Sequence, residues 1–230
     1  MIEKENLTLD QIYNADETSL FNRMMPSKIL ASKEEASALG YKKSKDQVSL
    51  LVCANASGID KLLLLLIGKS KNPRSFKNIN VNSLQMKYRN QRSVWMNSEI
   101  FEKWFHDDFV PHVKQHLAQL NLSPNVVLPI DNAPCHLDEE MPTSGEIRAI
   151  FLPTNVTSLI QPMDQGVIEA MKRHYKKKLM THILECEENL YEALKKNVKD
   201  VIYTIAQAIS KSSYDPKIMP QNNCSKEERG

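Results

Sequence analysis

Two runs of apolar residues in the first third of the chain predict a pair of strands. Val48–Ala54 and Leu62–Ile67 are apolar at almost every successive position. Residues 55–60 between them include Asn, Ser, Gly and Asp, which favour turns. Because neither run alternates apolar with polar side chains, we expect helices to cover both faces of this antiparallel hairpin.

Three shorter apolar runs predict further strands, around Gln11–Ala15, at Val126–Ile130 and at Ile147–Leu152. The first of these runs ends at the carboxylate pair Asp16-Glu17, and the second ends at Asp131. Residues 21–46 are polar and basic and contain Pro and Gly, so we expect a loop or excursion there.

Apolar residues recur at three- and four-residue steps in three segments, which predicts helices. The first covers 97–119, with Asn97 or Ser98 as its cap and Pro111 as a kink or break. The second opens at Pro162-Met163-Asp164, and the third covers roughly Asn189–Ser210. This order of strands and helices favours an α/β fold, a mixed sheet with helices on both faces.

Composition narrows the class of protein. The chain has 230 residues, 41% hydrophobic and 25% charged, and a formal net charge of +2. Affinity for a polyanion must therefore come from local patches. Four cysteines without a Cys-x-x-Cys pair argue against a disulfide framework or a zinc site and favour a reducing, intracellular compartment. The longest wholly apolar run, Leu62–Ile67, is too short for a membrane helix. With only six glycines and no Gly-rich loop, we expect no small-molecule cofactor.

Three aspartates are the candidate chemical groups. Asp16 and Asp131 follow predicted strands, and Asp164 lies in the first turn of a predicted helix. Strand ends and helix starts line the ligand crevice of an open α/β sheet. Carboxylates suit Mg²⁺, and a cation would relieve the repulsion between converging aspartates. Each aspartate also has a purely structural explanation: an Asx turn for Asp16, a loop before Pro134 for Asp131, and a helix N-cap for Asp164.

Five segments in fixed order carry a family resemblance: YNADETSLF at 13–21, LVCANASG at 51–58, IGKSKNPRSFKN at 67–78, DNAPCH at 131–136 and FLPTNVTSLIQPMDQGVI at 151–168. Together they resemble the DDE domain of pogo/Tigger transposases and of their jerky-like and centromere-protein-B-like relatives, over about residues 9–182. The resemblance implies an RNase H-like fold with a five-stranded mixed sheet and helices on both faces. It also implies that Asp16, Asp131 and Asp164 hold catalytic Mg²⁺ or Mn²⁺, that the partner is DNA, and that the protein is nuclear.

Three functions follow as hypotheses. The first is a metal-dependent DNA endonuclease or strand transferase domain. The intact aspartates favour this first hypothesis, which is the leading one. The second is a domesticated nuclear module that binds DNA or protein without cleaving. The start of the chain speaks for this rival, because it lies almost at the first motif, without the helix-turn-helix region usual in the family. The third is a nuclease acting on RNA or structured DNA. The sequence leaves open whether the protein forms a homodimer.

We expect residues 1–185 to form the catalytic domain, 186–212 a helical extension and 213–230 a disordered tail. The predicted helix after Asp164 carries a run of basic residues, interpreted either as a solvated face or as DNA-phosphate contacts: Lys172, Arg173, His174, Lys176, Lys177 and Lys178. Four loop residues could act in the same way: Lys69, Lys71, Arg74 and Lys77. His136 is expected to support the site, and Glu17 to point to the opposite face from Asp16.

Overall fold

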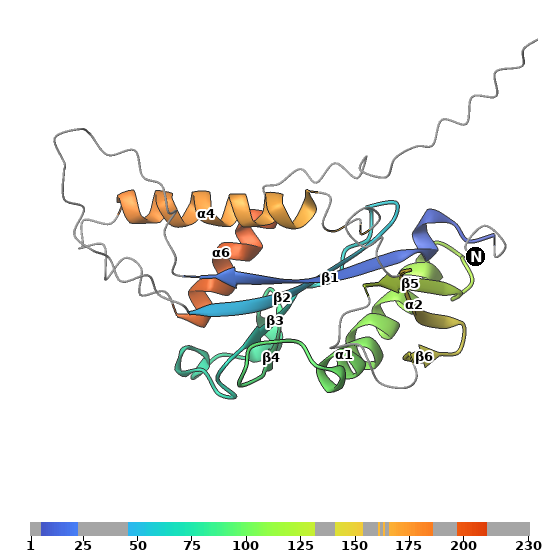
Figure 1. The fold of residues 1–230 in the computed structure, drawn as a ribbon, viewed down its shortest axis with the longest axis horizontal. Helices are drawn as coiled ribbons and strands as arrows, with labels where there is room; N and C mark the ends of the chain where they lie inside the picture. Colours follow the sequence, from blue (N-terminus) through green and yellow to red (C-terminus); the bar gives the residue numbers. More distant parts are fainter. Residues whose placement is uncertain are drawn as a thin grey trace, which may run out of the picture.

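The computed structural model describes residues 6–22, 46–131, 141–153, 161, 163, 166–185 and 197–210. The strands of these residues form two sheets (Figure 1), a four-stranded sheet in the order β1-β2-β3-β4 and a three-stranded sheet in the order β5-β7-β6. Their bounds are β1 Tyr13–Phe21, β2 Gln47–Asn55, β3 Leu65–Gly68, β4 Lys87–Asn90, β5 Val126–Ile130, β6 Thr143–Ser144 and β7 Ile147–Phe151. The predicted α/β class with mixed pairing is confirmed.

The predicted hairpin is present as β2 and β3. These strands pair antiparallel, with Leu50 opposite Leu66. All four residues of β3 are buried, as are most of those in β2. The second strand is shorter than predicted, because residues 62–64 lie outside the ladder and only the bridge between Ala54 and Lys61 connects this segment to β2. Burial on both faces explains why neither run alternates.

The two sheets meet where β1 begins. Ile12 forms a parallel bridge with Val127 of β5, but no continuous ladder joins β1 to β5 in the described residues. Pro129 in β5 accounts for this break. Its carbonyl faces β1, where it accepts a side-chain bond from Asn14, and its nitrogen carries no hydrogen to donate to β1. The predicted single sheet of five strands is therefore not confirmed.

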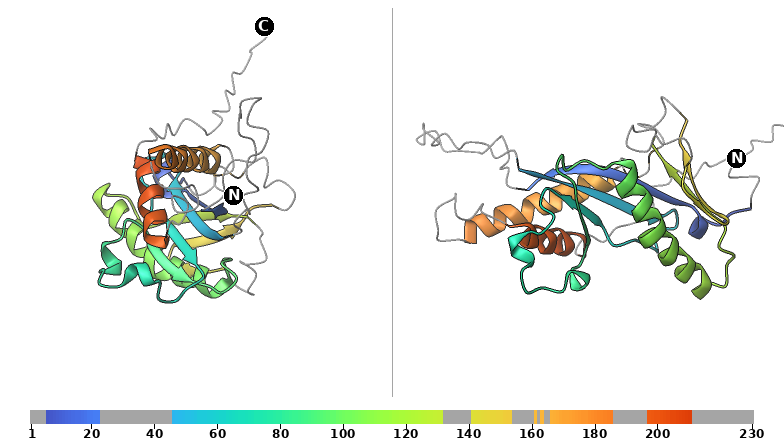
Figure 2. Two further views of the ribbon diagram at one scale, coloured as in Figure 1. Left: turned by 90° about the vertical axis from the view of Figure 1, so that its left-hand side faces the viewer. Right: turned by 90° about the horizontal axis from the view of Figure 1, so that it is seen from below.

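Helices cover both faces of the first sheet, as predicted (Figures 1 and 2). On one face lie α1 (Ser98–Trp104), the π-helical turn η5 (Phe105–Phe109) and α2 (Val110–Gln119). Their buried aromatic side chains pack against residues such as Leu51 and Leu65. On the other face lie α4 (Val167–Glu185) and α6 (Val198–Ser210), which pack against residues such as Leu50 and Leu66. Three short helical turns complete the described elements: η2 Leu9–Gln11, η3 Arg74–Phe76 and η4 Val81–Ser83.

The predicted helix over 97–119 is present and is divided, as Pro111 suggested. Asn97 caps α1 by accepting a hydrogen bond of 3.0 Å from the backbone N–H of Ile100. Pro111 stands in the first turn of α2, where its missing N–H removes a bond that a continuous helix would need. The chain widens into η5 directly before that point.

The predicted first strand is wrong in its extent. It was expected around Gln11–Ala15 with Asp16 at its end, whereas β1 continues to Phe21 and Asp16 lies within it. The polar stretch after Asp16 remains extended because it pairs along its whole length with β2, and because Thr18 and Leu20 are buried. Strands β4 and β6 were not predicted; both are short, and β4 is polar and exposed at its ends.

Helix α6 falls within the third predicted helix, whose first residues lie outside the described part of the chain. Val201, Ile202 and Ile205 of α6 are fully buried in the core that α4 shares. None of the helices in the described part of the chain combines the length and hydrophobicity that crossing a bilayer demands. The described cysteine, Cys53, is buried and unpaired with another sulfur.

Candidate active site

Asp16 and Asp131 stand on adjacent segments of β1 and β5. The parallel bridge between Ile12 and Val127 sets the register of these two segments. Parallel strands rise together by about 3.3 Å per residue, so four residues further along the register brings Asp16 level with Asp131. Asp131 directly follows Ile130, the last residue of β5. The position predicted for Asp131, at a strand end, is the one found.

The surroundings of Asp16 are polar and partly open. Asp16 lies opposite Val52 of β2, and both Asp16 and Asp131 are half-buried. One carboxylate oxygen of Asp16, Oδ1, accepts a hydrogen bond of 2.7 Å from the backbone N–H of Glu17. Alternation along the strand puts Asp16 on the face that α4 covers and Glu17 on the opposite face, as predicted for Glu17. Both carboxylates keep the partial access to solvent that a hydrated cation needs.

Asn14 joins three segments of the chain behind these carboxylates. Its side-chain nitrogen Nδ2 donates to the carbonyl oxygen of Pro129 at 2.9 Å and to Oε1 of Gln161 at 3.0 Å. Its Oδ1 accepts from the backbone N–H of Met163 at 3.3 Å. Asn14 is only 6% exposed, so these bonds are made away from water. In a buried setting, an amide that satisfies both its donors and its acceptor fixes its neighbours firmly.

Gln161 strengthens the same junction. It is fully buried, and its Nε2 donates to the carbonyl oxygen of Ala15 at 3.2 Å. Met163 packs with Val167 and Ile168 of α4 against Ala54. The segment that leads into α4 is thus bonded to the two residues that precede Asp16, Asn14 and Ala15. Asp164 itself lies outside the described residues, and so does His136.

The described residues supply two carboxylates to this site. Among them, no group of three His, Cys, Asp or Glu side chains is close enough to hold a metal ion. Two carboxylates are nevertheless what proteins usually offer Mg²⁺, because water and substrate oxygens complete its shell. Asp16 and Asp131 offer only oxygen donors, are half-buried and stand on adjacent segments, and these features fit a hard divalent cation.

The basic residues predicted to contact DNA lie along α4. Arg173, Lys176 and Lys177 are exposed, while Lys172 is half-buried and Lys178 donates to Oε1 of Gln207 on α6 at 3.0 Å. The opposite side of α4 carries its buried residues, Met171, Tyr175 and Leu179. The three exposed cations therefore form a ridge on the outer side of the helix that covers the Asp16 face.

A second polar cluster holds the start of β1 from the opposite face. The Tyr13 hydroxyl donates to Oδ2 of Asp60 at 2.5 Å, and Nε2 of His112 on α2 lies 2.9 Å from Oδ1 of Asp60. Burial alone would raise the pKa of Asp60, but the hydrogen bonds from His112 and Tyr13, together with the charges of His112 and His116, outweigh it and lower that pKa. Burial and the bond to Asp60 raise the pKa of Tyr13. This cluster ties β1 to α2 beneath the site.

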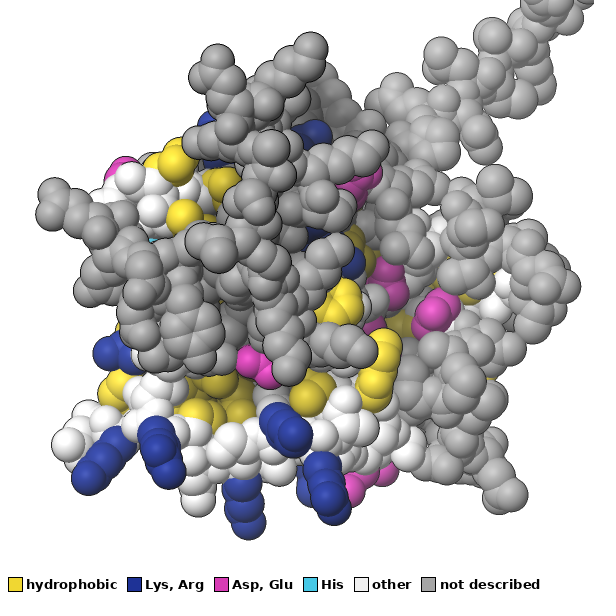
Figure 3. Space-filling view, turned by 60° about the vertical axis from the view of Figure 1, so that its left-hand side comes forward, with side chains coloured by type: hydrophobic (Ala, Val, Ile, Leu, Met, Phe, Trp, Pro, Cys, Tyr) yellow, Lys and Arg dark blue, Asp and Glu magenta, His cyan; other side chains and the backbone are white. Residues whose placement is uncertain are grey.

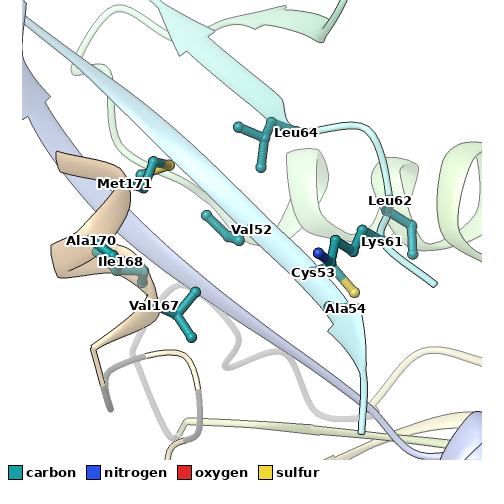
Figure 4. Close-up of a pocket in the computed structure, with 10 residues that line it drawn as sticks. All are labelled: Val52, Cys53, Ala54, Lys61, Leu62, Leu64, Val167, Ile168, Ala170 and Met171. Carbon is teal, nitrogen blue, oxygen red and sulfur yellow. The ribbon is translucent and has the colours of Figure 1, made fainter. Parts of the chain in front are cut away.

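A small apolar cavity of about 80 Å³ separates the first turns of α4 from β2 (Figure 4). Val167, Ile168 and Met171 face Val52 and Ala54 across it. The space equals the liquid volume of two or three water molecules, and its apolar lining favours an empty void over a ligand site. We interpret this cavity as a packing gap beneath α4.

Sequence reasoning missed Asn14 and Gln161 as residues of the site. Both are polar side chains in segments otherwise interpreted as strand and loop, and neither belongs to a residue class that signals metal chemistry. The available signal was their place inside the YNADETSLF and QPMDQG segments, since each precedes one of the predicted metal ligands.

Comparison with known proteins gives consistent matches. The family described as DDE superfamily endonuclease matches residues 45–218. The human protein "Tigger transposable element-derived protein 7" is 38% identical over 221 residues, which cover 91% of this chain and 40% of that protein. The human "Jerky protein homolog" is 39% identical over 174 residues, 75% of this chain and 30% of that protein. The chain thus spans less than half the length of these relatives.

Among solved structures, "Mos1 transposase paired-end complex with left transposon end" superposes with a TM-score of 0.44 at 13% identity, over 91% of this chain and 56% of that one. "Crystal structure of the Mos1 mariner paired end complex with Mn" gives 0.43 at 14% identity, with the same coverage. These are distant similarities in shape. The family match covers most of the chain, and the similarity to the human relatives exceeds 30% identity. The chain therefore belongs to the DDE superfamily endonucleases, alongside the Tigger transposable element-derived and Jerky proteins.

Proposed function

We propose that this chain is the catalytic domain of a metal-dependent DNA endonuclease or strand transferase of transposase origin, acting on DNA phosphodiesters in the nucleus. The observation that carries the proposal is the junction at Asn14. Asn14 precedes Asp16 by two residues, Pro129 precedes Asp131 by two, and Met163 precedes Asp164 by one. One buried side chain bonds all three segments, which supports a shared site for the three aspartates.

The proposed metal ligands are Asp16, Asp131 and Asp164, and the metal is Mg²⁺ or Mn²⁺. When bound, divalent cations at such a site lower the pKa of an attacking water and offset charge on the phosphate oxygens. The chain's own part is to hold the carboxylates. Asn14 and Gln161 fix the backbone that carries them, and the bond from the Glu17 N–H restrains the Asp16 carboxylate. Pre-set ligands of this kind lower the cost of ordering the site when metal and substrate bind.

The ridge of Arg173, Lys176 and Lys177 supports DNA as the substrate. Its side chains are exposed on the helix that covers the Asp16 face. Lysine and arginine at such a place contact phosphates and position the duplex without reading its sequence. The relatives named above carry transposase-derived or Jerky names, and membership of an endonuclease family agrees with a phosphodiester substrate.

A plasmid-nicking assay tests the proposal. Purified protein is incubated with supercoiled plasmid and Mg²⁺ or Mn²⁺, and nicked circles are quantified for the wild type, for Asp16→Asn, Asp131→Asn and Asp164→Asn, and for Asp107→Asn as a matched control. Asp107 is exposed on η5, on the opposite face of the sheet. We expect nicking by the wild type and Asp107→Asn, and a loss of at least 100-fold in each of the other variants.

Equal nicking by the wild type and Asp131→Asn would overturn the assignment of the site. If the wild type binds DNA but neither it nor any variant nicks it, the alternative of a non-cleaving, domesticated binding module is favoured instead.

A further inference from the structure

The segment from Lys61 to Ser98 is strongly and one-sidedly charged. It contains eight basic residues and no Asp or Glu, although basic and acidic residues are nearly balanced over the whole chain at 30 and 28. The basic residues are Lys61, Lys69, Lys71, Arg74, Lys77, Lys87, Arg89 and Arg92. Blocks of like charge repel one another, so a folded segment that keeps such an excess is a candidate to face a polyanion.

Four of these eight residues, Lys69, Lys71, Arg74 and Lys77, belong to the excursion between β3 and β4. This excursion contains η3 and η4 and encloses an open groove of about 600 Å³. Lys71, Arg74, Lys77 and Arg89 line the groove. Figure 3 shows Lys and Arg side chains gathered along the lower rim of the molecule, the level at which the excursion lies in Figure 1. The groove is therefore a basic surface and not a closed pocket.

Three close contacts brace the floor of the groove. The Tyr88 hydroxyl donates to the carbonyl oxygen of Ser70 at 2.5 Å, and the ring of Phe76 meets that of Tyr88 edge to face at a centroid distance of 4.9 Å. Gly68 lies so close to Tyr88 that an added Cβ would come within 2.6 Å of its hydroxyl oxygen. These contacts brace the backbone from which the basic side chains project, and a braced backbone loses less entropy when a ligand binds.

The cations of the groove differ in their present partners. Arg89 of β4 lies 3.2 Å from Asp108 of η5, and Lys87 lies 3.1 Å from the other oxygen of that carboxylate. This pairing anchors β4 to the helical layer. Lys71, Arg74 and Lys77 are exposed and have no acidic partner in the described part of the chain. These three cations, which pair with no acidic residue that the structure describes, are available to a ligand.

We propose that this groove binds the phosphate backbone of duplex DNA at a second contact surface, separate from the aspartate site. The choice of DNA over other polyanions rests on the proposed function. Asp16 on β1 is three strand spacings away from β4, and the groove lies about four residues further along β4. The two steps together give a distance on the order of 20 Å between Asp16 and the groove. A duplex rises about 3.4 Å per base pair, so one duplex crossing both surfaces would contact them about six base pairs apart.

The shape of the groove favours a duplex over a small anion or a folded RNA loop. Its cations project from an open surface, and the exposed side chains offer point charges without a buried pocket for a flipped base. Such contacts suit a stiff, regularly spaced backbone and carry no sequence information. Recognition of unpaired RNA uses exposed aromatic faces for stacking, whereas Phe76 and Tyr88 are engaged with each other.

Salt-dependent binding tests the proposal without cleavage. The dissociation constant for a nonspecific duplex oligonucleotide is measured in EDTA at several salt concentrations for the wild type, for K71Q/R74Q/K77Q and for K103Q/K114Q/K199Q, a control that removes three cations from α1, α2 and α6. Each lost phosphate contact lowers the slope of log K against log salt by about 0.9. For the groove variant we expect the magnitude of the slope to fall by about 2–3 and the affinity to fall at least tenfold. For the control we expect the magnitude of the slope to fall by less than about 1.

A charge-preserving variant, K71R/K77R, should keep the wild-type slope, and melting temperatures check that all variants fold. Equal slopes for the groove variant and the control would overturn the proposal, as would a loss confined to single-stranded RNA. Because the assay needs no metal, it is independent of nicking. If the wild type does not nick DNA but the groove variant still loses salt-dependent binding, only the proposed function is refuted. If the wild type nicks DNA but the groove variant and the control have equal slopes, only the groove proposal is refuted.

Discussion

The side-chain nitrogen of Asn14 donates to the carbonyl oxygen of Pro129 at 2.9 Å, at the point where the backbone ladder between β1 and β5 is broken. Pro129 has no N–H to offer β1, so at this point the bond between the two strands comes from a side chain. The same asparagine accepts from Met163. Pro129 stands in β5, the end strand of its sheet, and its carbonyl is left free to accept the bond from Asn14.

Replacing Asn14 should therefore disturb both stability and activity. Asn14→Ala leaves the buried groups that it bonds on Pro129, Gln161 and Met163 without that partner, and we expect a loss of about 2–4 kcal/mol in the free energy of unfolding. Chemical denaturation measures this loss. Asn82→Ala, at an exposed asparagine in η4, is the control and should change stability by less than about 0.5 kcal/mol.

Activity separates a positioning role for Asn14 from a purely structural one. At a temperature where Asn14→Ala is still folded, we expect nicking to fall at least tenfold, with a higher Mn²⁺ concentration needed for half-maximal rate. An unchanged metal requirement would contradict the positioning role.

The Asp60 cluster predicts a dependence of stability on pH. Its folded-state pKa is lowered from the ordinary value of 3.8, so the carboxylate contributes stability that is present above about pH 3.8 and lost as pH falls through the folded pKa. Asp60→Asn should cost about 1–3 kcal/mol at pH 6, because Tyr13 and His112 lose a charged acceptor. Urea denaturation from pH 6 to pH 3 should show this difference shrinking below pH 3.8. A difference that stays constant over the whole range contradicts this account of the cluster.

The close approach of Gly68 to Tyr88 gives a prediction for the groove floor. A methyl group at Gly68 would force the Tyr88 ring away from Phe76 and break its bond to Ser70, so Gly68→Ala should destabilise the protein by about 1–3 kcal/mol. Tyr88→Phe removes only the hydroxyl bond and should cost about 0.5–1.5 kcal/mol. Thermal melting compares the two variants, and a smaller loss for Gly68→Ala than for Tyr88→Phe contradicts the packing argument.

The spacing of apolar residues predicted the strands and helices whose buried residues follow a regular order. The apolar runs of β2, β3, β5 and β7 and the three- and four-residue steps of α1 and α2 report burial directly, and Pro111 marked the break between these two helices. The second half of β1 and all of β4 were missed because their sequences are polar and their extended form depends on pairing with distant partners. A pattern of apolar residues indicates which residues are buried, but it does not indicate the distant strand whose pairing keeps a polar segment extended.

The sequence indicates which carboxylates are the candidate ligands, but it does not indicate the residues that support them. Carboxylates are a residue class that indicates metal chemistry, and the ordered motifs around them resemble those of a known family. Asn14 and Gln161 are buried amides whose partners lie more than 100 residues away in the sequence. Asn14 bonds Pro129 and Met163, and Gln161 bonds Asn14 and Ala15. No local pattern encodes such a meeting, so the structure was needed to identify the residue that joins the segments.

The central claim is that Asp16 and Asp131 bind one divalent metal site together, and metal-dependent stabilisation tests it most directly. A ligand that binds only the folded state at 100 times its Kd stabilises by about 2.7 kcal/mol, which corresponds to a rise in Tm of about 5–10 °C for a chain of this size. We predict that saturating Mn²⁺ raises the Tm of the wild type and of Asp107→Asn by that amount, and that Asp16→Asn and Asp131→Asn each lose most of the rise. A full Mn²⁺-dependent rise in either Asp16→Asn or Asp131→Asn would contradict the shared site.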